Sequence, residues 1–478
     1  MLFNSIDFAL FLPVVFILYW FVTPKYLNLQ NLLLVGASYF FYALWDWRFL
    51  SLIVFSTVLD FIVGILLDKE SNEGKRKLYL FISIAVNLGF LGFFKYYNFF
   101  LENFIEVFSL FGMSLRASSL HIILPVGISF YTFQTMSYTI DIYRKNLKPT
   151  NDFIAFAAFV SFFPQLVAGP IERATQLLPQ FYVRRKFDNE NAVSGLRQIL
   201  WGLFKKVVIA DNCAFYANEI FNNYSDYSGS TLVLGAVFFT FQIYCDFSGY
   251  SDIAIGTSRL FGFNLMKNFS YPYFSRDIGE FWRRWHISLS TWFRDYLYIP
   301  IGGSRGGVWS KIRNIFIIFI VSGFWHGANW TFVIWGALNA IYFLPLMLRE
   351  NNRRNIGIVA SETSLPSFKE LMQILFTFSL SVLAWIFFRS DSLVDSFGYL
   401  NGIMNINLFS LPNVLPTRVI AFIGVLVVIE WWGRREEFAI DKLHLRMKPY
   451  ARYIFYYSLL FSILWLGGEE QEFIYFQF

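Results

Sequence analysis

The sequence predicts an all-α polytopic membrane protein, and three observations point to this class. Hydrophobic residues make up 56% of the 478 residues, aromatic residues 21% and charged residues only 15%. Soluble domains carry about 25% charged residues, so this chain has too few charges to cover a water-exposed surface. The apolar runs are continuous rather than alternating, which favours membrane-spanning helices over a β-barrel. The same composition excludes disordered and fibrous chains.

A transmembrane helix needs about 20 mostly apolar residues. Runs of this kind follow one another along the chain and predict about ten to twelve spans, in one membrane domain over residues 1–466. The run His121–Tyr143 contains Pro125, Gly127 and several hydroxyl side chains, so it predicts a broken or re-entrant helix. The runs are Phe8–Val22, Leu32–Ala43, Leu50–Leu67, Leu78–Phe94, Phe99–Phe111, His121–Tyr143, Phe153–Val167, Leu232–Tyr244, Ile315–Phe324, Thr331–Leu348, Leu371–Phe388, Val419–Trp432 and Tyr453–Leu466.

Basic residues predict the orientation in the membrane, because positively charged loops stay in the cytoplasm. The net charge of +6 is therefore interpreted as cytoplasmic loops and not as nucleic-acid binding. The tail, residues 467–478, contains three Glu and no Lys or Arg, and is expected on the extracytoplasmic side. The basic clusters are Lys75–Lys77, Arg184–Lys186, Lys205–Lys206, Arg283–Arg313, Arg349–Arg354 and Arg434–Lys448.

His326 lies between two apolar runs, in the stretch SGFWHGANW of residues 322–330. Counted as helix, it lies about 20 Å beyond Arg313, well inside an apolar core about 30 Å thick. A neutral imidazole at that depth can accept a proton and return it, as acyl transfer to a hydroxyl requires. The alternative is a hydrogen-bonded histidine that packs helices together. Asn329, in the same stretch, is a candidate substrate-binding residue.

His286 lies in the tryptophan- and arginine-rich stretch FWRRWHISLSTWFRDY, residues 281–296, where Trp282, Trp285 and Trp292 recur at helical spacing. One interpretation is an amphipathic interfacial helix, with aromatic rings among the lipid headgroups and arginines toward anionic lipid. The other is a cytoplasmic mouth that binds a phosphate-bearing donor. The candidate donor-binding residues are Trp282, Arg283, Arg284, Trp285 and Arg294.

Asp246 and Asp252 are further candidates, because they are acidic residues in the apolar stretch YCDFSGYSD, residues 244–252. A carboxylate there can orient a histidine, bind a cation, or pair with an arginine for structural reasons. Cys213 and Cys245 lack the CxxC spacing of a metal site and are interpreted as small buried residues. No bound metal or cofactor is expected.

Five segments in order make the chain resemble the membrane-bound O-acyltransferase (MBOAT) family, in its bacterial branch for alginate and peptidoglycan O-acetylation. They lie between Leu124 and Gly336, and the spans on either side also fit, so the resemblance covers nearly the whole chain. The segments are LPVGISFYTFQ (124–134), FPQLVAGPI (163–171), the stretch 244–252, FWRRWHISLSTWFRDYLYIPIGG (281–303) and SGFWHGANWTFVIWG (322–336).

The resemblance implies a ring of helices around a thinned centre, with a funnel from each side. It implies that His326 is the catalytic histidine, and that His286 is the second signature histidine, near the cytoplasmic funnel. It also implies that an acetyl group passes from acetyl-CoA through a bacterial inner membrane to an extracytoplasmic polysaccharide, with a separate SGNH-type acetyltransferase as partner. Many members carry another histidine after the WG of the last segment, where this chain has Asn339-Ala340, so no catalytic role is placed there.

The aromatic end of the tail, FIYFQF at residues 473–478, resembles the terminal motif of the small partner peptide of teichoic-acid D-alanylation. A tyrosine of that motif is proposed to carry the acyl group, and Tyr475 is the matching residue here. Since a phenol has a pKa of about 10, its ester is activated and can pass the acyl group to a hydroxyl. A base such as His326 can deprotonate the phenol. The alternative is an aromatic tail at the membrane interface.

Three function classes are compared. The motifs favour an MBOAT O-acetyltransferase, with D-alanyl transfer to teichoic acid as an alternative within the class. A glycan or lipid transporter predicts inverted repeats, but the first half of the chain has no counterpart of His326 or of the tryptophan-rich stretch. A non-catalytic scaffold is disfavoured by the two histidines. The expected partners are membrane lipid, acetyl-CoA, the polysaccharide acceptor and the SGNH-type protein, without nucleic acid.

Overall fold

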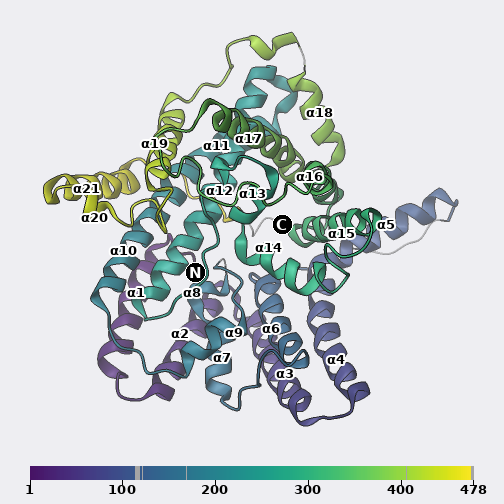
Figure 1. The fold of residues 1–478 in the computed structure, drawn as a ribbon, viewed down its shortest axis with the longest axis vertical. Helices are drawn as coiled ribbons and strands as arrows, with labels where there is room; N and C mark the ends of the chain where they lie inside the picture. Colours follow the sequence, from purple (N-terminus) through teal and green to yellow (C-terminus); the bar gives the residue numbers. More distant parts are fainter. Residues whose placement is uncertain (114–118, 121, 168, 405, 475–478) are drawn as a thin grey trace. The chain divides into compact units, whose positions relative to one another are not determined.

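The computed structural model describes residues 1–113, 119–120, 122–167, 169–404 and 406–474, and all regular structure in these ranges is helical. The predicted all-α class is therefore confirmed. The chain forms two compact units, each described by itself below (Figure 1). The first is Met1–Ala192 with Thr257–Met266, and the second is Val193–Gly256 with Lys267–Phe478.

Six helical stretches among the described residues are long and apolar enough to cross a membrane, which confirms a polytopic membrane protein. The number is below the expected ten to twelve for two reasons: Leu27–Lys69 and Glu73–Leu110 each contain two of the expected runs, and several other runs form helices shorter than about 20 residues. Thr417–Gly433 and Pro449–Trp465, for example, have 17 residues each. The six stretches are Leu27–Lys69, Glu73–Leu110, Gly229–Leu260, Val308–His326, Trp330–Leu348 and Phe368–Arg389.

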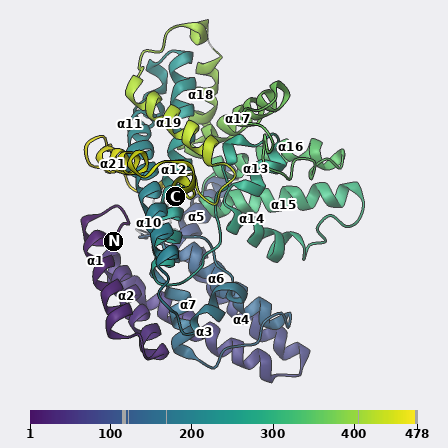
Figure 2. The same ribbon diagram turned by 60° about the vertical axis from the view of Figure 1, so that its left-hand side comes forward.

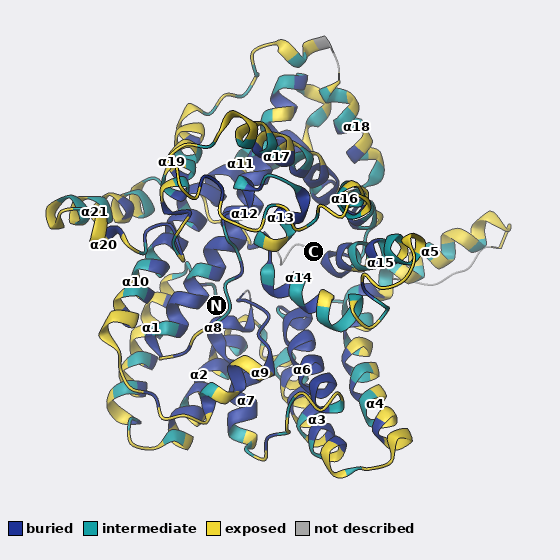
Figure 3. Cartoon of the chain, in the orientation of Figure 1, coloured by how far each residue is buried: buried dark blue, intermediate teal, exposed yellow. Residues whose placement is uncertain are grey.

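The first unit packs its helices around α6, in which every residue from Ile128 to Ile142 is buried (Figure 3). The predicted break in this apolar run is confirmed. Gly127, with a φ of 74°, lies immediately before the first turn of α6. The helices are α1 (Ile6–Ile17), α2 (Leu27–Asp46), α3 (Leu50–Lys69), α4 (Glu73–Leu91), α5 (Tyr97–Leu110), α6 (Ile128–Tyr143), α7 (Phe153–Ser161), α8 (Phe163–Leu166) and α9 (Ala174–Leu177). Helix α10 (Asn189–Leu203) continues into the second unit.

One predicted span of the first unit is wrong. Phe153–Val167 forms the two short helices α7 and α8, of nine and four residues, and neither is long enough to cross a bilayer. Phe162 separates them in a non-helical conformation (ψ 106°), and Pro164 lies in the first turn of α8. A proline has no N–H to continue a preceding helix but is tolerated where a new helix starts.

A polar seam crosses the apolar interior of the first unit. The Asp60 carboxylate on α3 accepts hydrogen bonds from Ser83 Oγ at 2.6 Å and from Asn87 Nδ2 at 2.9 Å, both on α4. All three residues are buried. These donors satisfy a carboxylate that would otherwise be unfavourable in an apolar interior.

The second unit contains a closely packed helix pair, α15 and α16, which lie side by side in Figures 1 and 2. Asn329 caps α16, and Ser367 begins α17 with a reciprocal capping box to Glu370. The helices are α11 (Asp211–Asn222), α12 (Gly229–Leu260), α13 (Ile278–Arg284), α14 (Ile287–Phe293), α15 (Val308–His326), α16 (Trp330–Leu348), α17 (Phe368–Arg389), α18 (Leu393–Ile403), α19 (Thr417–Gly433), α20 (Leu443–Arg446) and α21 (Pro449–Trp465). The last turn of α12, from Thr257, belongs to the first unit.

Lys205 and Lys206 differ from the sequence-based interpretation. They were counted among the basic loop residues, but both are buried in the π-helical segment Phe204–Ala210. Lys205 pairs with Asp252 at 2.6 Å, and Lys206 pairs with Asp211 at 2.8 Å. The sequence alone shows their charge but not these partners, so they do not mark a cytoplasmic loop.

Candidate functional site

His326 is the last residue of α15, at the break between α15 and α16. Gly327 adopts an extended conformation (φ −162°, ψ 151°) and ends the helix. The Asn329 side chain accepts a hydrogen bond from the Thr331 N–H at 3.0 Å and so starts the next helix. The break places the histidine at the junction of the two helices.

Two glycines let α15 and α16 approach each other at this junction. A Cβ at Gly323 would collide with the carbonyl oxygen of Phe332, and a Cβ at Gly336 with that of Phe319. Small residues of this kind allow close packing of helix backbones in membranes. The glycines of the segment 322–336 therefore have a structural role: they allow α15 and α16 to pack closely at the junction that carries His326.

Aromatic rings enclose the imidazole of His326. Its centroid lies 4.9 Å from that of Trp325, 5.3 Å from that of Trp335 and 5.2 Å from that of Phe388. Only 4% of His326 is exposed. Exclusion of water strengthens any electrostatic interaction that the imidazole makes with a bound substrate.

His286 joins α13 to α14 in a left-handed backbone conformation, with φ 42°. This conformation is rare for a residue with a Cβ, is unfavourable by about 1–3 kcal/mol, and persists only where the surroundings enforce it. Asn268 supplies the contacts: its Oδ1 lies 3.0 Å from His286 Nδ1, and its backbone carbonyl accepts from the Ile287 N–H at 2.9 Å.

The hydrogen bonds of Asn268 determine which nitrogen of His286 is basic. The backbone N–H of Ser288, which can only donate, points at Asn268 Oδ1 (3.4 Å), so this atom is an acceptor. It follows that Nδ1 of His286 donates and that Nε2 is the basic nitrogen. Burial lowers the pKa of His286 to about 3, so the imidazole is neutral over the physiological range.

His286 and His326 both line one cavity of about 460 Å³. This volume is typical of a pocket for a ligand or cofactor. The Trp325 ring contacts both imidazoles, with centroid distances of 6.2 Å to His286 and 4.9 Å to His326. The two histidines, predicted from separate motifs, thus lie in one site. Four other predicted residues also line it, namely Trp282, Arg283, Trp285 and Arg294.

Arg284 does not line the cavity, although it neighbours Arg283 in the sequence. Arg284 and Arg276 both bind the Glu280 carboxylate, at 2.8 and 3.0 Å, and Glu280 is 1% exposed. Arg284 also donates to the carbonyl of Gly357 at 3.2 Å. Its contacts are those of a buried structural ion-pair network.

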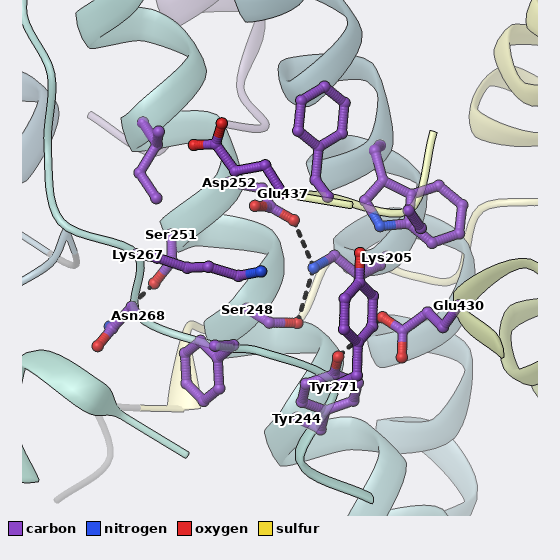
Figure 4. Close-up of a pocket in the computed structure, with 15 residues that line it drawn as sticks. Lys205, Tyr244, Ser248, Ser251, Asp252, Lys267, Asn268, Tyr271, Glu430 and Glu437 are labelled. Carbon is purple, nitrogen blue, oxygen red and sulfur yellow. Dashed lines mark hydrogen bonds and ion pairs between the residues drawn. The ribbon is translucent and has the colours of Figure 1, made fainter. Parts of the chain in front are cut away.

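Asp252 and Asn329 also lie away from this cavity. Asp252 binds Lys205 and accepts from Gln198 Nε2 at 2.8 Å, beside a second pocket of about 20 Å³, room for roughly one water (Figure 4). Asn268 lines this second pocket and donates to Ser251 Oγ at 3.2 Å (Figure 4). Asn329 caps α16 and donates to the Asp391 carbonyl at 2.8 Å.

Asp246 contacts the C-terminal tail, which the structure describes as far as Ile474. Asp246 Oδ1 pairs with Lys206 at 2.8 Å, and its Oδ2 accepts the Ile474 N–H at 2.7 Å. Phe473 and Ile474 are buried, at 0% and 1% exposure. Tyr475 lies outside the described residues, so its predicted role as acyl carrier stays a prediction.

Three residues at these sites were not among the sequence-based candidates. Asn268 orients His286, Lys206 contacts the tail, and Lys311 lines the large cavity. Lys311 falls within the basic cluster Arg283–Arg313, so its charge was noted without a role. Asn268 carries no sequence signal, because a single asparagine in a loop is ordinary.

A helical membrane protein in which two buried histidines and the basic side chains Arg283, Arg294 and Lys311 line one cavity has the features of a membrane enzyme. Comparison with known families agrees. The model of "MBOAT, membrane-bound O-acyltransferase family" matches residues 7–388, and the chain belongs to this family. The protein is therefore an O-acyltransferase, which decides between the enzyme and the transporter considered from the sequence.

The similar proteins of known name include acetylases of two polysaccharides. The chain is 39% identical over 443 residues to "Probable alginate O-acetylase AlgI" of Pseudomonas aeruginosa, covering 91% of this chain and 82% of the relative. It is 37% identical over 443 residues to the peptidoglycan O-acetyltransferase of Helicobacter pylori, covering 87% and 82%. A teichoic acid D-alanyltransferase of Bacillus subtilis matches at 29% over 228 residues, 45% of this chain and 57% of the relative.

Proposed function

We propose that this protein moves an acetyl group from cytoplasmic acetyl-CoA across the bacterial inner membrane for O-acetylation of an extracytoplasmic polysaccharide. The observation that carries the proposal is the single cavity lined by His286, His326 and basic side chains. The acetylases of alginate and peptidoglycan are the relatives that match over most of their length, which supports acetyl as the acyl group and a glycan as the acceptor.

The donor enters the cavity past His286 and the residues around it. Arg283, Arg294 and Lys311 line this cavity and suit the phosphates of coenzyme A, because guanidinium and ammonium groups bind phosphate by charge-assisted hydrogen bonds. Trp282 and Trp285 supply an apolar wall for the uncharged arm of the thioester. The Arg283 guanidinium also donates to the carbonyls of Asn352 and Asn355, at 2.7 and 2.9 Å, which hold it in place.

His326 acts as the general base in this proposal. It removes the phenolic proton of Tyr475 as the oxygen attacks the thioester carbonyl carbon. A C–O bond forms, the C–S bond breaks, and the imidazolium returns the proton to the leaving thiolate. In the second transfer a hydroxyl oxygen attacks the carbonyl carbon of the aryl ester. A new C–O bond to the acetyl group forms, the bond to the tyrosine oxygen breaks, and the hydroxyl proton goes to that tyrosine oxygen. A separate SGNH-type protein then delivers the group to the glycan.

The buried course of the tail supports the role of Tyr475 over that of an aromatic residue at the membrane interface. Phe473 packs against Phe247 at 6.0 Å between ring centroids, and Phe247 also packs against the His286 imidazole, at 4.6 Å. The tail therefore approaches the histidine-lined site from within the second unit. The extracytoplasmic location of the C-terminus is part of the same proposal.

The proposal is tested with purified protein in lipid nanodiscs and radiolabelled acetyl-CoA. Label is expected on the wild-type chain and should fall by roughly 10²- to 10⁴-fold in His326→Ala, as for removal of a general base. His444→Ala is the matched control, because His444 is exposed and lies outside the cavity. Full labelling of His326→Ala would overturn the assignment of the base.

The acyl carrier is tested by Tyr475→Phe, with Tyr457→Phe as control because Tyr457 is 69% exposed on α21. Loss of label in the first variant alone supports the carrier, and equal labelling of both contradicts it. The acceptor is identified by the acetyl content of exopolysaccharide and peptidoglycan in a deletion strain. Incorporation of D-alanine into teichoic acid is the alternative that the same strain would reveal.

A further inference from the structure

Three buried charged groups gather beside the end of the tail. Lys206 Nζ lies 2.8 Å from Asp211 Oδ1 and 2.8 Å from Asp246 Oδ1, and these side chains are at most 3% exposed. One cation thus faces two carboxyl groups. Buried acidic groups need further hydrogen-bond donors for the oxygens that the cation does not satisfy.

The main chain of the tail donates one hydrogen bond to this charged cluster and accepts one from it. The N–H of Ile474 donates to Asp246 Oδ2 at 2.7 Å, and Lys206 Nζ donates to the carbonyl of Gln471 at 3.1 Å. Both contacts are to the backbone. Between them Phe473 packs on Tyr250, with ring centroids 4.2 Å apart. The site therefore contacts the tail at two main-chain groups and at one aromatic side chain.

The entry of the tail is fixed as well. Gly468 donates its N–H to the carbonyl of Val207 at 3.0 Å, and a Cβ at Gly468 would come within 2.7 Å of the Asn212 nitrogen. The side chains of Glu469, Glu470 and Glu472 are exposed. The number of residues between Gly468 and Phe473 is therefore constrained by contacts at both ends, whereas the exposed side chains between them are not.

We propose that Lys206 and Asp246 form a receptor for the backbone of the tail and are positioning residues that set how deeply the tail is inserted. Asp246 is adjacent to Phe247, which contacts both Phe473 and the His286 imidazole. The depth of insertion thus determines how far the chain beyond Ile474 can reach toward the cavity. The link to catalysis rests on the proposed function, but the docking of the tail does not.

Docking is measured apart from catalysis by the maleimide reactivity of Ile474→Cys in the purified full chain. The native Cys213 and Cys245 are buried, so they stay unreactive as long as the protein is folded and serve as an internal control. Asp246→Ala, and separately one glycine inserted between Glu470 and Gln471, should each raise the labelling rate of Ile474→Cys by about tenfold or more, since each removes a buried hydrogen bond to a charged group.

The matched control keeps the length of the tail and changes its charge: Glu469→Gln with Glu470→Gln should leave the labelling rate unchanged. Equal rates in the wild-type, Asp246→Ala and insertion backgrounds would overturn the receptor, whatever happens to acetyl transfer. Faster labelling together with reduced acetyl transfer supports both the receptor and the positioning role. Faster labelling with full acetyl transfer supports the receptor and overturns the positioning role.

Discussion

Replacement of Asn268 by alanine tests the support of His286 most directly. The change removes the acceptor of two buried donors, Nδ1–H of His286 and the hydroxyl of Ser288, which lies 2.9 Å from Asn268 Oδ1. Each buried donor left without an acceptor is unfavourable by about 1–3 kcal/mol, so the free energy of unfolding should fall by roughly 2–6 kcal/mol. The neighbouring pocket has room for about one water, which can replace one acceptor and favours the lower end of this range.

Activity gives the second readout for Asn268. Without the acceptor, Nδ1 of His286 no longer has to carry the hydrogen, so the acetyl-transfer rate should fall more than the amount of folded protein. Asn268→Asp is the matched variant, because it keeps the acceptor and adds a negative charge. A carboxylate favours the imidazolium, so the pKa of His286 should rise and the acidic limb of the pH–rate profile should move to higher pH. Wild-type stability and rate in Asn268→Ala would refute the argument.

Three further predictions concern packing, buried charge and pH. Gly336→Ala should lower stability by about 1–3 kcal/mol through overpacking, measured by unfolding in detergent, while Gly424→Ala, with no atom within 4 Å of its Cβ, should not. Glu280→Ala leaves two arginines without their shared carboxylate and should lower the free energy of unfolding by about 3–5 kcal/mol; an unchanged melting temperature would contradict the network. The pKa of His286 is about 3 in the fold against 6.5 in the unfolded chain, so the unfolded state binds more protons below pH 6.5. Stability should therefore decrease as the pH falls from 6.5 toward 3, and a flat pH dependence would show that His286 is not buried neutral.

The class of fold and the two histidines of the cavity, with Trp282, Arg283, Trp285 and Arg294 beside them, follow from local features of the sequence. Composition and continuous apolar runs predict membrane helices, and the motifs around His286 and His326 predict the residues that meet in the cavity. Helical periodicity alone does not separate Arg283 from Arg284. Glu280 lies one helical turn before Arg284 and is a local partner, but the carbonyl of Gly357, which also binds Arg284, is brought into place only by the folded chain.

Tertiary pairing explains the remaining differences. The sequence is compatible with three roles for Asp246 and Asp252, and both make ion pairs with lysines at least 40 positions away in the sequence. Asp60 lies inside the predicted span Leu50–Leu67, and its partners on α4 become visible only once the two helices pack together. No periodicity or composition rule encodes such pairs, because they depend on the register between helices.

The buried tail also sets an order of events during biosynthesis. Residues 468–474 are synthesised after every helix that they contact. Helix α12 and the segment Phe204–Ala210 are therefore made before the tail that fills the space beside them. Until then Lys206 and Asp246 face an open slot, and the second unit has an incomplete interior. A chain interrupted after α21 would carry all its helices and still lack part of its core, a defect that membrane proteases can detect as local unfolding.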